Sequence, residues 1–297
     1  MSLVRSRLLA VTELFKPITW FPPMWAFACG VVASGVSLSQ QWALILLGIL
    51  LAGPMVCATS QAINDWFDRH VDAINEPQRP IPSGRIPGNW GLYIALIWTA
   101  ASLAVATALG PWGFLAALLG LVLAWAYSMP PIRFKQNGWI GNLACGLSYE
   151  GLAWMTGAAV MAGGAMPESR SLALAFLYSL GAHGIMTLND FKSMEGDRVM
   201  GVRSLPVQLG ARRAAWTACL TMALPQVGVI ALLVWWGAPL SALCVALLLL
   251  GQAWLMRGFL ANPIARARFY SGFGVPLFVA GMMVSAFALR ELSQLQP

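Results

Sequence analysis

Long runs without a charged side chain alternate along this chain with short charged segments. The three longest runs contain no Asp, Glu, Lys or Arg and cover residues 17–64, 86–132 and 214–256. A helix that crosses a bilayer needs about 20 apolar residues, so each run has room for two spans and a turn. Shorter, largely apolar stretches at 136–167, 171–189 and 269–289 have room for one span each. The pattern predicts an all-α membrane protein with nine transmembrane helices.

Composition supports this class of protein. Hydrophobic residues make up 59% of the 297 residues and charged residues only 10%, whereas soluble domains carry about 25% charged residues. This excludes an ordinary cytosolic enzyme, a secreted disulfide scaffold and a disordered protein. The runs do not alternate apolar and polar residues as barrel strands do. The five cysteines lie in apolar stretches without metal-ligand spacing, and we interpret them as small buried hydrophobic residues.

The positive charges predict the orientation in the membrane. All but two of the 18 Lys and Arg lie at the N-terminus or in the loops after the second, fourth, sixth and eighth predicted helices, and the exceptions are Arg170 and Arg290. Because positive loops stay in the cytoplasm, we expect the N-terminus there and the C-terminus outside. The net charge of +7 fits anionic lipid headgroups or an anionic substrate. The chain has no basic patch outside the membrane-flanking loops that would indicate binding to nucleic acid.

Seven of the eleven acidic residues gather in two of these loops. In the first loop, Asn64, Asp68 and Asp72 are spaced four residues apart, which places them on one face of a helix. Three oxygen side chains in a row repel one another unless they hold a cation. Magnesium prefers oxygen ligands and is usually shared with substrate phosphates. The stripe therefore predicts a magnesium–phosphate site.

The second loop resembles the first at an offset of 125 residues. The matched pairs are Asn64 with Asn189, Asp65 with Asp190, Asp68 with Ser193 and Asp72 with Asp197. Seven residues separate Asp190 from Asp197, so we expect them to share a helix face, with Glu195 off it. The chain is predicted to be one domain, 1–297, with a possible internal duplication whose halves divide at about 135/136. Acidic clusters of the two halves then face each other across a central cavity.

Solvated helix caps are the alternative for these loops, but two similar loops on one side of a chain with few acids favour a site. The cations that would meet a diphosphate as charged hydrogen-bond donors lie in the same group of loops. They are Arg69, Arg79, Arg133, Lys135, Lys192 and Arg198. Anchoring of the loops on the cytoplasmic side explains Arg133 and Lys135 equally well.

Two ionisable residues fall inside predicted spans, where they are costly and suggest function. Glu150 lies in the fifth predicted helix and His183 in the sixth, seven residues before Asp190 and on the same face. A neutral histidine there can bind a metal centre in a substrate or accept a proton. A core histidine bonded to a neighbouring helix, and a structural hydrogen bond for Glu150, are equally good explanations.

In these motifs the sequence resembles the UbiA superfamily of intramembrane prenyltransferases. Asn64, Asp68 and Asp72 match its NxxxDxxxD motif, and the second acidic loop stands where the family has a second Asp-rich motif. The resemblance is closer to the chlorophyll synthase branch. It rests on the runs 64–65, 72–77, 79–84, 127–131, 189–193 and 195–198. Residues 16–20 and Glu150 look most like the bacterial bacteriochlorophyll synthases.

The resemblance implies nine helices around a central cavity, in an inner membrane (cytoplasmic or intracytoplasmic). It implies Mg²⁺ as cofactor, held by Asn64, Asp68, Asp72, Asp190, Asp197 and Glu195. Of these, Asp68, Asp72, Asp190 and Asp197 are the expected catalytic residues. Many superfamily members carry Asp where this chain has Ser193, so Asp190 is expected to substitute.

The implied donor is geranylgeranyl or phytyl diphosphate, and the implied acceptor is bacteriochlorophyllide, whose propionate attacks the first carbon of the tail. His183, Glu150 and Tyr127 are the expected acceptor contacts, and the implied partners are the lipid bilayer and other proteins of pigment biosynthesis. Another superfamily member, acting on a quinone or haem, remains open. So does an ion-coupled transporter, although transporters place such groups at mid-membrane. A pigment-carrying assembly protein would leave the acidic loops unexplained.

Overall fold

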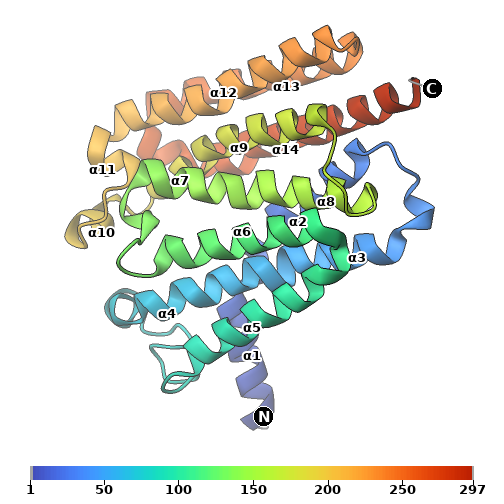
Figure 1. Ribbon diagram of the computed structural model, residues 1–297. Helices are drawn as coiled ribbons and strands as arrows, with labels where there is room; N and C mark the ends of the chain where they lie inside the picture. Colours follow the sequence, from blue (N-terminus) through green and yellow to red (C-terminus); the bar gives the residue numbers. More distant parts are fainter. Residues whose placement is uncertain (1–2, 296–297) are drawn as a thin grey trace.

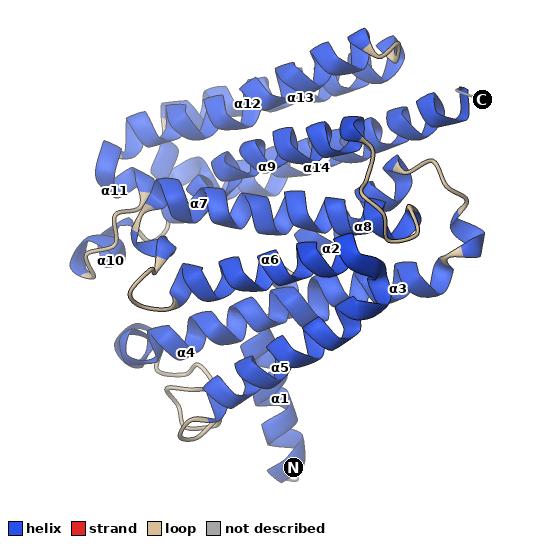
Figure 2. Cartoon of the chain, viewed as in Figure 1, coloured by secondary structure: helices blue, strands red, loops and turns tan. Residues whose placement is uncertain are grey.

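The computed structural model describes residues 3–295, and within that range the chain is built from helices with no strand (Figures 1 and 2). This confirms the all-α prediction. The first half contains α1 (Leu3–Phe15), η1 (Pro17–Thr19), α2 (Phe21–Ala33), η2 (Leu38–Gln40), α3 (Trp42–Leu50), η3 (Leu51–Cys57), α4 (Ala58–Asn75), α5 (Trp90–Ala106), η4 (Thr107–Leu109) and α6 (Gly110–Ser128). The second contains η5 (Phe134–Gln136), α7 (Gly138–Gly146), η6 (Leu147–Leu152), α8 (Ala153–Met161), α9 (Ser169–Asp190), α10 (Met194–Val199), α11 (Leu205–Leu209), α12 (Ala211–Trp235), α13 (Pro239–Ala261) and α14 (Pro263–Leu295).

Six continuous helical stretches in the described chain are long and apolar enough to cross a membrane. One of them joins α5 and α6, which pack against each other on either side of a turn at Gly110, where φ is 77°. Two further segments complete the bundle, the short apolar helix α2 and the broken helix formed by α7, η6 and α8. Residues 3–295 thus hold nine helical segments, the number that the lengths of the apolar runs predict, although α2 has only 13 residues and is shorter than a full span.

Glycines allow α2 and α8 to cross in close contact. A Cβ atom placed on Gly30 would lie 2.0 Å from the carbonyl oxygen of Trp154. A Cβ atom on Gly157 would lie 2.1 Å from the carbonyl oxygen of Phe27. Lipid tails are as apolar as side chains, so membrane helices associate through close packing at small residues. This crossing holds the first and second halves of the chain together.

Two helices of the bundle contain a π-helical segment, η3 and η6. Proline lacks an N–H group and breaks the regular hydrogen bonding of a helix, and Pro54 lies inside η3. The indole of Trp98 donates a hydrogen bond to the carbonyl of Pro54 at 3.0 Å, so this carbonyl has a partner. Such local widening of helices is frequent at functional sites, and both segments contribute to the wall of a cavity described below.

The loops that carry the acidic motifs meet at one end of the bundle (Figure 1). The end of α4, the connection from α6 to α7 and the segment around α10 and α11 lie together there. Backbone hydrogen bonds join the last two of these, from the amide of Gly138 to the carbonyl of Arg203 at 2.8 Å and from the amide of Arg203 to the carbonyl of Gln136 at 3.0 Å. The fold therefore joins two loops that are about 65 residues apart in the sequence, and together they cover this end of the bundle.

Candidate active site

A polar cavity of about 390 Å³ lies beneath these joined loops. Its walls come from α4, the α6–α7 connection, α7, and the segment from the end of α9 to Ser204. The charged and hydrogen-bonding side chains that line it include Asp68, Arg133, Lys135, Asn142, Asp190, Ser193 and Asp197. The structure thus brings carboxylates of both acidic loops and cations of the α6–α7 connection to one place.

On the α4 side, Asp68 is held by two cations. The Lys135 ammonium lies 2.6 Å from each carboxylate oxygen, and a guanidinium nitrogen of Arg133 lies 3.1 Å from one of them. The side chain of Lys135 is only 11% exposed and that of Asp68 is 19% exposed. Burial lowers the pKa of the Lys135 ammonium, and the negative charge of Asp68 opposes this shift. The cavity therefore contains a shielded group of charges.

On the opposite side, Asn142 from α7 donates a hydrogen bond to Asp190 at 3.2 Å, and Ser193 donates one to Asp197 at 3.0 Å. The expectation that Asp190 and Asp197 share one helix face is wrong, because α9 ends at Asp190 and Asp197 belongs to the separate helix α10. At the break the backbone amide of Ser193 bonds the carbonyl of Asp190 at 3.2 Å, a hydrogen bond across three residues in place of the α-helical bond across four. The returning chain still directs both carboxylates into the cavity.

Asp72 lies beside the polar cavity and does not line it. Arg79 holds Asp72 at 2.9 Å and reaches Asp65 at 3.4 Å, while Lys16 binds Asp65 at 2.6 Å. Burial alone would lower the pKa of the Arg79 guanidinium, but the negative charges of Asp65 and Asp72 raise this pKa above its ordinary value. Asp65 is 1% exposed, and its partner Lys16 lies 49 residues away along the chain, so the spacing of the motif gives no signal for this buried ion pair.

Several predicted site residues lie outside the cavity. Glu195, Lys192 and Arg198 are exposed and line neither this cavity nor the apolar one described next. The guanidinium of Arg69 stacks over the ring of Trp66, 4.0 Å from its centre. No three His, Cys, Asp or Glu side chains within residues 3–295 are close enough to hold a metal ion by themselves.

The two ionisable residues expected near the acceptor are buried in the bundle. His183 is 7% exposed and packs against the ring of Trp139 at 5.7 Å, facing α7. Glu150 is 4% exposed, and one of its carboxylate oxygens has no hydrogen-bond partner among the described residues. Neither residue lines the polar cavity or the apolar cavity described next.

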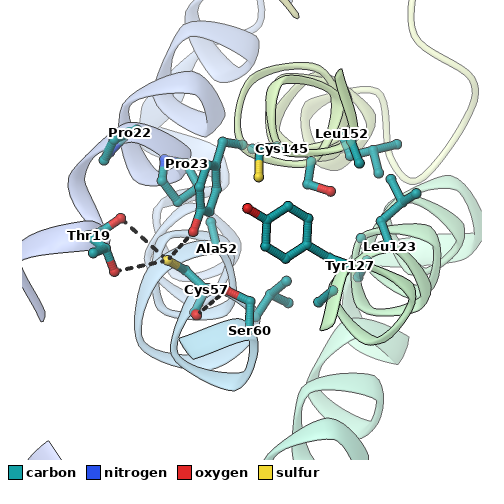
Figure 3. Close-up of a pocket in the computed structure, with 18 of the residues that line it drawn as sticks. Thr19, Pro22, Pro23, Ala52, Cys57, Ser60, Leu123, Tyr127, Cys145 and Leu152 are labelled. Atoms are coloured by element: carbon teal, nitrogen blue, oxygen red, sulfur yellow. Dashed lines mark hydrogen bonds between the residues drawn. The ribbon is translucent and has the colours of Figure 1, made fainter. Parts of the chain in front are cut away.

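A second, apolar cavity of about 400 Å³ adjoins the polar one. Tyr127 lines both cavities, and Asn64 and Asn189 line the apolar one. Figure 3 shows Tyr127 pointing into the apolar cavity, with Thr19, Cys57 and Ser60 on the opposite wall. On α6 the lining continues as Leu123, Gly120, Ala117 and Ala116. Since a helix rises 1.5 Å per residue, this wall extends for roughly 16 Å away from Tyr127.

The five cysteines are free, and three of them are buried as predicted, whereas Cys145 and Cys244 are only partly buried. Cys29 and Cys219 are buried in the hydrophobic core. Cys57 and Cys145, however, line the apolar cavity. An apolar helix gives no sequence signal that distinguishes a side chain on a cavity wall from one in a packed core.

A polar cavity lined by cations and acids lies beside an apolar cavity in this helical membrane bundle, and Tyr127 lines both. Such a pair of cavities suits an amphipathic, anionic lipid. The family comparison agrees with this class of protein: residues 19–287 match the UbiA prenyltransferase family. The chain therefore belongs to the UbiA prenyltransferase family, and it is a multi-pass membrane prenyltransferase.

Among curated proteins, the chain is similar to the bacteriochlorophyll synthase 33 kDa chain of Cereibacter sphaeroides, with 57% identity over 96% of this chain and 94% of the relative. It is 47% identical to the bacteriochlorophyll synthase 34 kDa chain of Chloroflexus aurantiacus, over 93% of this chain and 89% of the relative. In fold it resembles a UbiA homologue from Archaeoglobus fulgidus bound to GPP and Mg²⁺. That match has a TM-score of 0.65, 21% identity, and coverage of 95% of this chain and 99% of the homologue.

Proposed function

We propose that this protein esterifies the propionate of a bacteriochlorophyllide with geranylgeranyl or phytyl diphosphate and releases diphosphate. The observation that carries the proposal is the junction of the polar and apolar cavities at Tyr127. A prenyl diphosphate has the same division between a charged head and an apolar tail. The relatives named as bacteriochlorophyll synthases support the choice of acceptor.

The polar cavity holds the diphosphate head. Arg133 offers a planar fork of donors and Lys135 a compact charge, which together suit phosphate oxygens. Both line the cavity on the side of Asp68. Because these groups are largely buried, their charges act through less water than at a surface and stabilise the negative charge that grows on the leaving group.

The donor set of this cavity also fits magnesium. Asp68, Asp190 and Asp197 present carboxylate oxygens on walls that Arg133 and Lys135 share. Mg²⁺ prefers such hard oxygen ligands and is commonly bound by one or two carboxylates together with substrate phosphates. When bound, the ion supplies Lewis acidity toward the departing diphosphate. Asn64 lines the neighbouring apolar cavity. Asp72 does not line the polar cavity and contributes through its ion pair with Arg79.

The apolar cavity holds the prenyl tail and keeps water from the reacting carbon. Its walls near Tyr127 are small or apolar residues of α6. The acceptor carboxylate is already ionised near neutral pH, since ordinary carboxyl groups have pKa values of about 4. The reaction therefore needs no strong general base, in agreement with the burial of His183 and Glu150 away from both cavities.

The positive loops favour a cytoplasmic position for the polar cavity. Arg203, Arg212, Arg257 and Arg266 belong to the loops on that side of the predicted topology. We propose an inner membrane, cytoplasmic or intracytoplasmic, with the N-terminus and the diphosphate site in the cytoplasm. Diphosphate would then leave directly into water.

The test is one incubation of the purified protein in lipid nanodiscs with labelled geranylgeranyl diphosphate, bacteriochlorophyllide and Mg²⁺. We expect an esterified pigment and an equal amount of diphosphate. Excess chelator should stop both, and added Mg²⁺ should restore them. Parallel incubations with a quinone precursor or haem as acceptor test the other branches of the family. Prenylation of one of those acceptors, with no pigment ester, would overturn the proposal.

A further inference from the structure

The wall of the apolar cavity contains a polar group that the proposed chemistry has not used. Tyr149 lies in the π-helical segment η6, is half-buried and lines the cavity. The amide of Gln61, from α4, donates a hydrogen bond to this hydroxyl oxygen at 3.2 Å. Both residues line the cavity, and Gln61 lies one turn before Asn64 on α4.

The surroundings of the hydroxyl determine where its proton can go. Its oxygen accepts from the amide of Gln61 at 3.2 Å and, more weakly, from the thiol of Cys57 at 3.7 Å. A thiol is a weak partner, and the Cys57 thiol already lies 3.3 Å from the carbonyl oxygen of Thr19. The Ser60 hydroxyl is a further neighbour of Tyr149, but it donates its own proton to the carbonyl of Cys57 at 2.7 Å, and Tyr149 donates no hydrogen bond of regular geometry within 3.5 Å to an oxygen or nitrogen of the described residues. The hydroxyl is therefore a fixed donor on the wall of the cavity.

A donor at this place suits the nucleophile. Gln61 and Asn64 occupy neighbouring turns of α4, so Tyr149 lies near the boundary of the two cavities, where the first carbon of the prenyl tail must sit. On the same wall, Thr19 and Pro22 line the cavity, while their neighbours Ile18 and Phe21 are 90% and 56% exposed. Thr19 and Pro22 are themselves only partly buried, so this wall lies close to the outer surface of the bundle, from which an acceptor dissolved in the lipid would approach.

We propose that Tyr149 binds the carboxylate of the acceptor by a hydrogen bond and that Gln61 orients its hydroxyl. Tyr149 is then an acceptor-binding residue and Gln61 a positioning residue. The bond keeps the carboxylate beside the allylic carbon without protonating it, so the carboxylate remains the nucleophile. This inference rests on the proposed function, since it takes a carboxylate as the acceptor group.

The test compares Tyr149→Phe with the matched control Tyr178→Phe. The control also removes one tyrosine hydroxyl. The hydroxyl of Tyr178, however, bonds Ser285 at 2.8 Å, and Tyr178 lines neither cavity. Hydrogen bonds to charged groups contribute about 1.5–3 kcal/mol, which corresponds to about 10- to 140-fold. We expect Tyr149→Phe to raise the KM for bacteriochlorophyllide by that factor and to leave the KM for the prenyl diphosphate unchanged. Tyr178→Phe should change neither constant.

A second variant separates positioning from a general loss of structure. Gln61→Leu should raise the acceptor KM by a smaller factor, and the double variant should be no worse than Tyr149→Phe, because Gln61 acts through that hydroxyl. An unchanged acceptor KM in Tyr149→Phe, or equal rises for both substrates, would overturn the inference. Strictly multiplicative effects in the double variant would overturn the role of Gln61. A wild-type protein that forms no pigment ester would instead refute the proposed function, which is a distinguishable result.

Discussion

Replacing Asp68 by Asn tests the polar cavity most directly, because Asn has nearly the same shape and lacks the charge. Asp68 has three contacts with cations, two with Lys135 at 2.6 Å and one with Arg133 at 3.1 Å. The exposed fractions of these three side chains lie between 11% and 26%. Breaking a buried pair costs about 3–5 kcal/mol and breaking a surface pair at most about 1 kcal/mol. For this intermediate exposure we expect a loss of about 2 kcal/mol in the free energy of unfolding.

A loss of this size leaves the variant folded, whereas its activity should fall much further. Removing one preorganised electrostatic group from an active site typically costs 10²–10³-fold in turnover. We expect Asp68→Asn to lose at least about 100-fold in the rate of ester formation. The assay is product formation at saturating donor and acceptor, with the same protein followed by thermal unfolding in nanodiscs.

Glu195→Gln is the matched comparison. It removes a carboxylate from the same region of the protein, but Glu195 is exposed and does not line the cavity. We expect less than about a threefold change in rate. If Asp68→Asn keeps more than about a tenth of wild-type activity, or if Glu195→Gln is as damaging, the assignment of the polar cavity as the diphosphate site is wrong.

Three further substitutions test the packing and the site. Gly30→Ala should destabilise the bundle by several kcal/mol, because its Cβ would overlap the carbonyl of Trp154. The control Gly272→Ala, where nothing lies within 4 Å, should be neutral or slightly stabilising. Similar melting temperatures for the two variants would contradict the close crossing of α2 and α8. Gln226 and Gln252 exchange hydrogen bonds at 3.1 and 2.9 Å with both side chains buried, so Gln252→Leu should cost about 1–3 kcal/mol and the double Leu variant less than the sum of the single losses. Asn142→Leu, which removes the donor to Asp190, should raise the Mg²⁺ concentration needed for half-maximal activity, and an unchanged requirement would separate Asp190 from metal binding.

The lengths of the apolar runs predict the helices well because the bilayer fixes how long a span must be. The same simple geometry explains where the prediction of the first motif stops. A step of four residues drifts about 40° around a helix, so Asp72 is turned about 80° from Asn64. In the structure Asn64 lines the apolar cavity, Asp68 the polar one, and Asp72 faces Arg79. Spacing identifies the stripe, but the neighbours decide what each member contacts.

His183 shows a related limit. It does share a face of α9 with Asp190, because the helix is continuous between them. Along one face, however, the neighbour changes with depth: Asp190 meets the cavity at the end of the helix, whereas His183 meets Trp139 of α7. A heptad spacing therefore predicts direction without predicting what lies in that direction.

The pairing of the acids depends on contacts that a single sequence does not reveal. Charges that leave water must be paired, and the excess of Lys and Arg over Asp and Glu ensures that cations are available. Which cation serves which acid is set by helices that meet far along the chain, since Asp68 is held from 65 and 67 residues away. The two cations nearest the proposed leaving group thus come from the connection after α6, whose positive charges alone are explained equally well by the anchoring of a loop. Only their convergence on Asp68 in a cavity distinguishes a diphosphate site from an anchor.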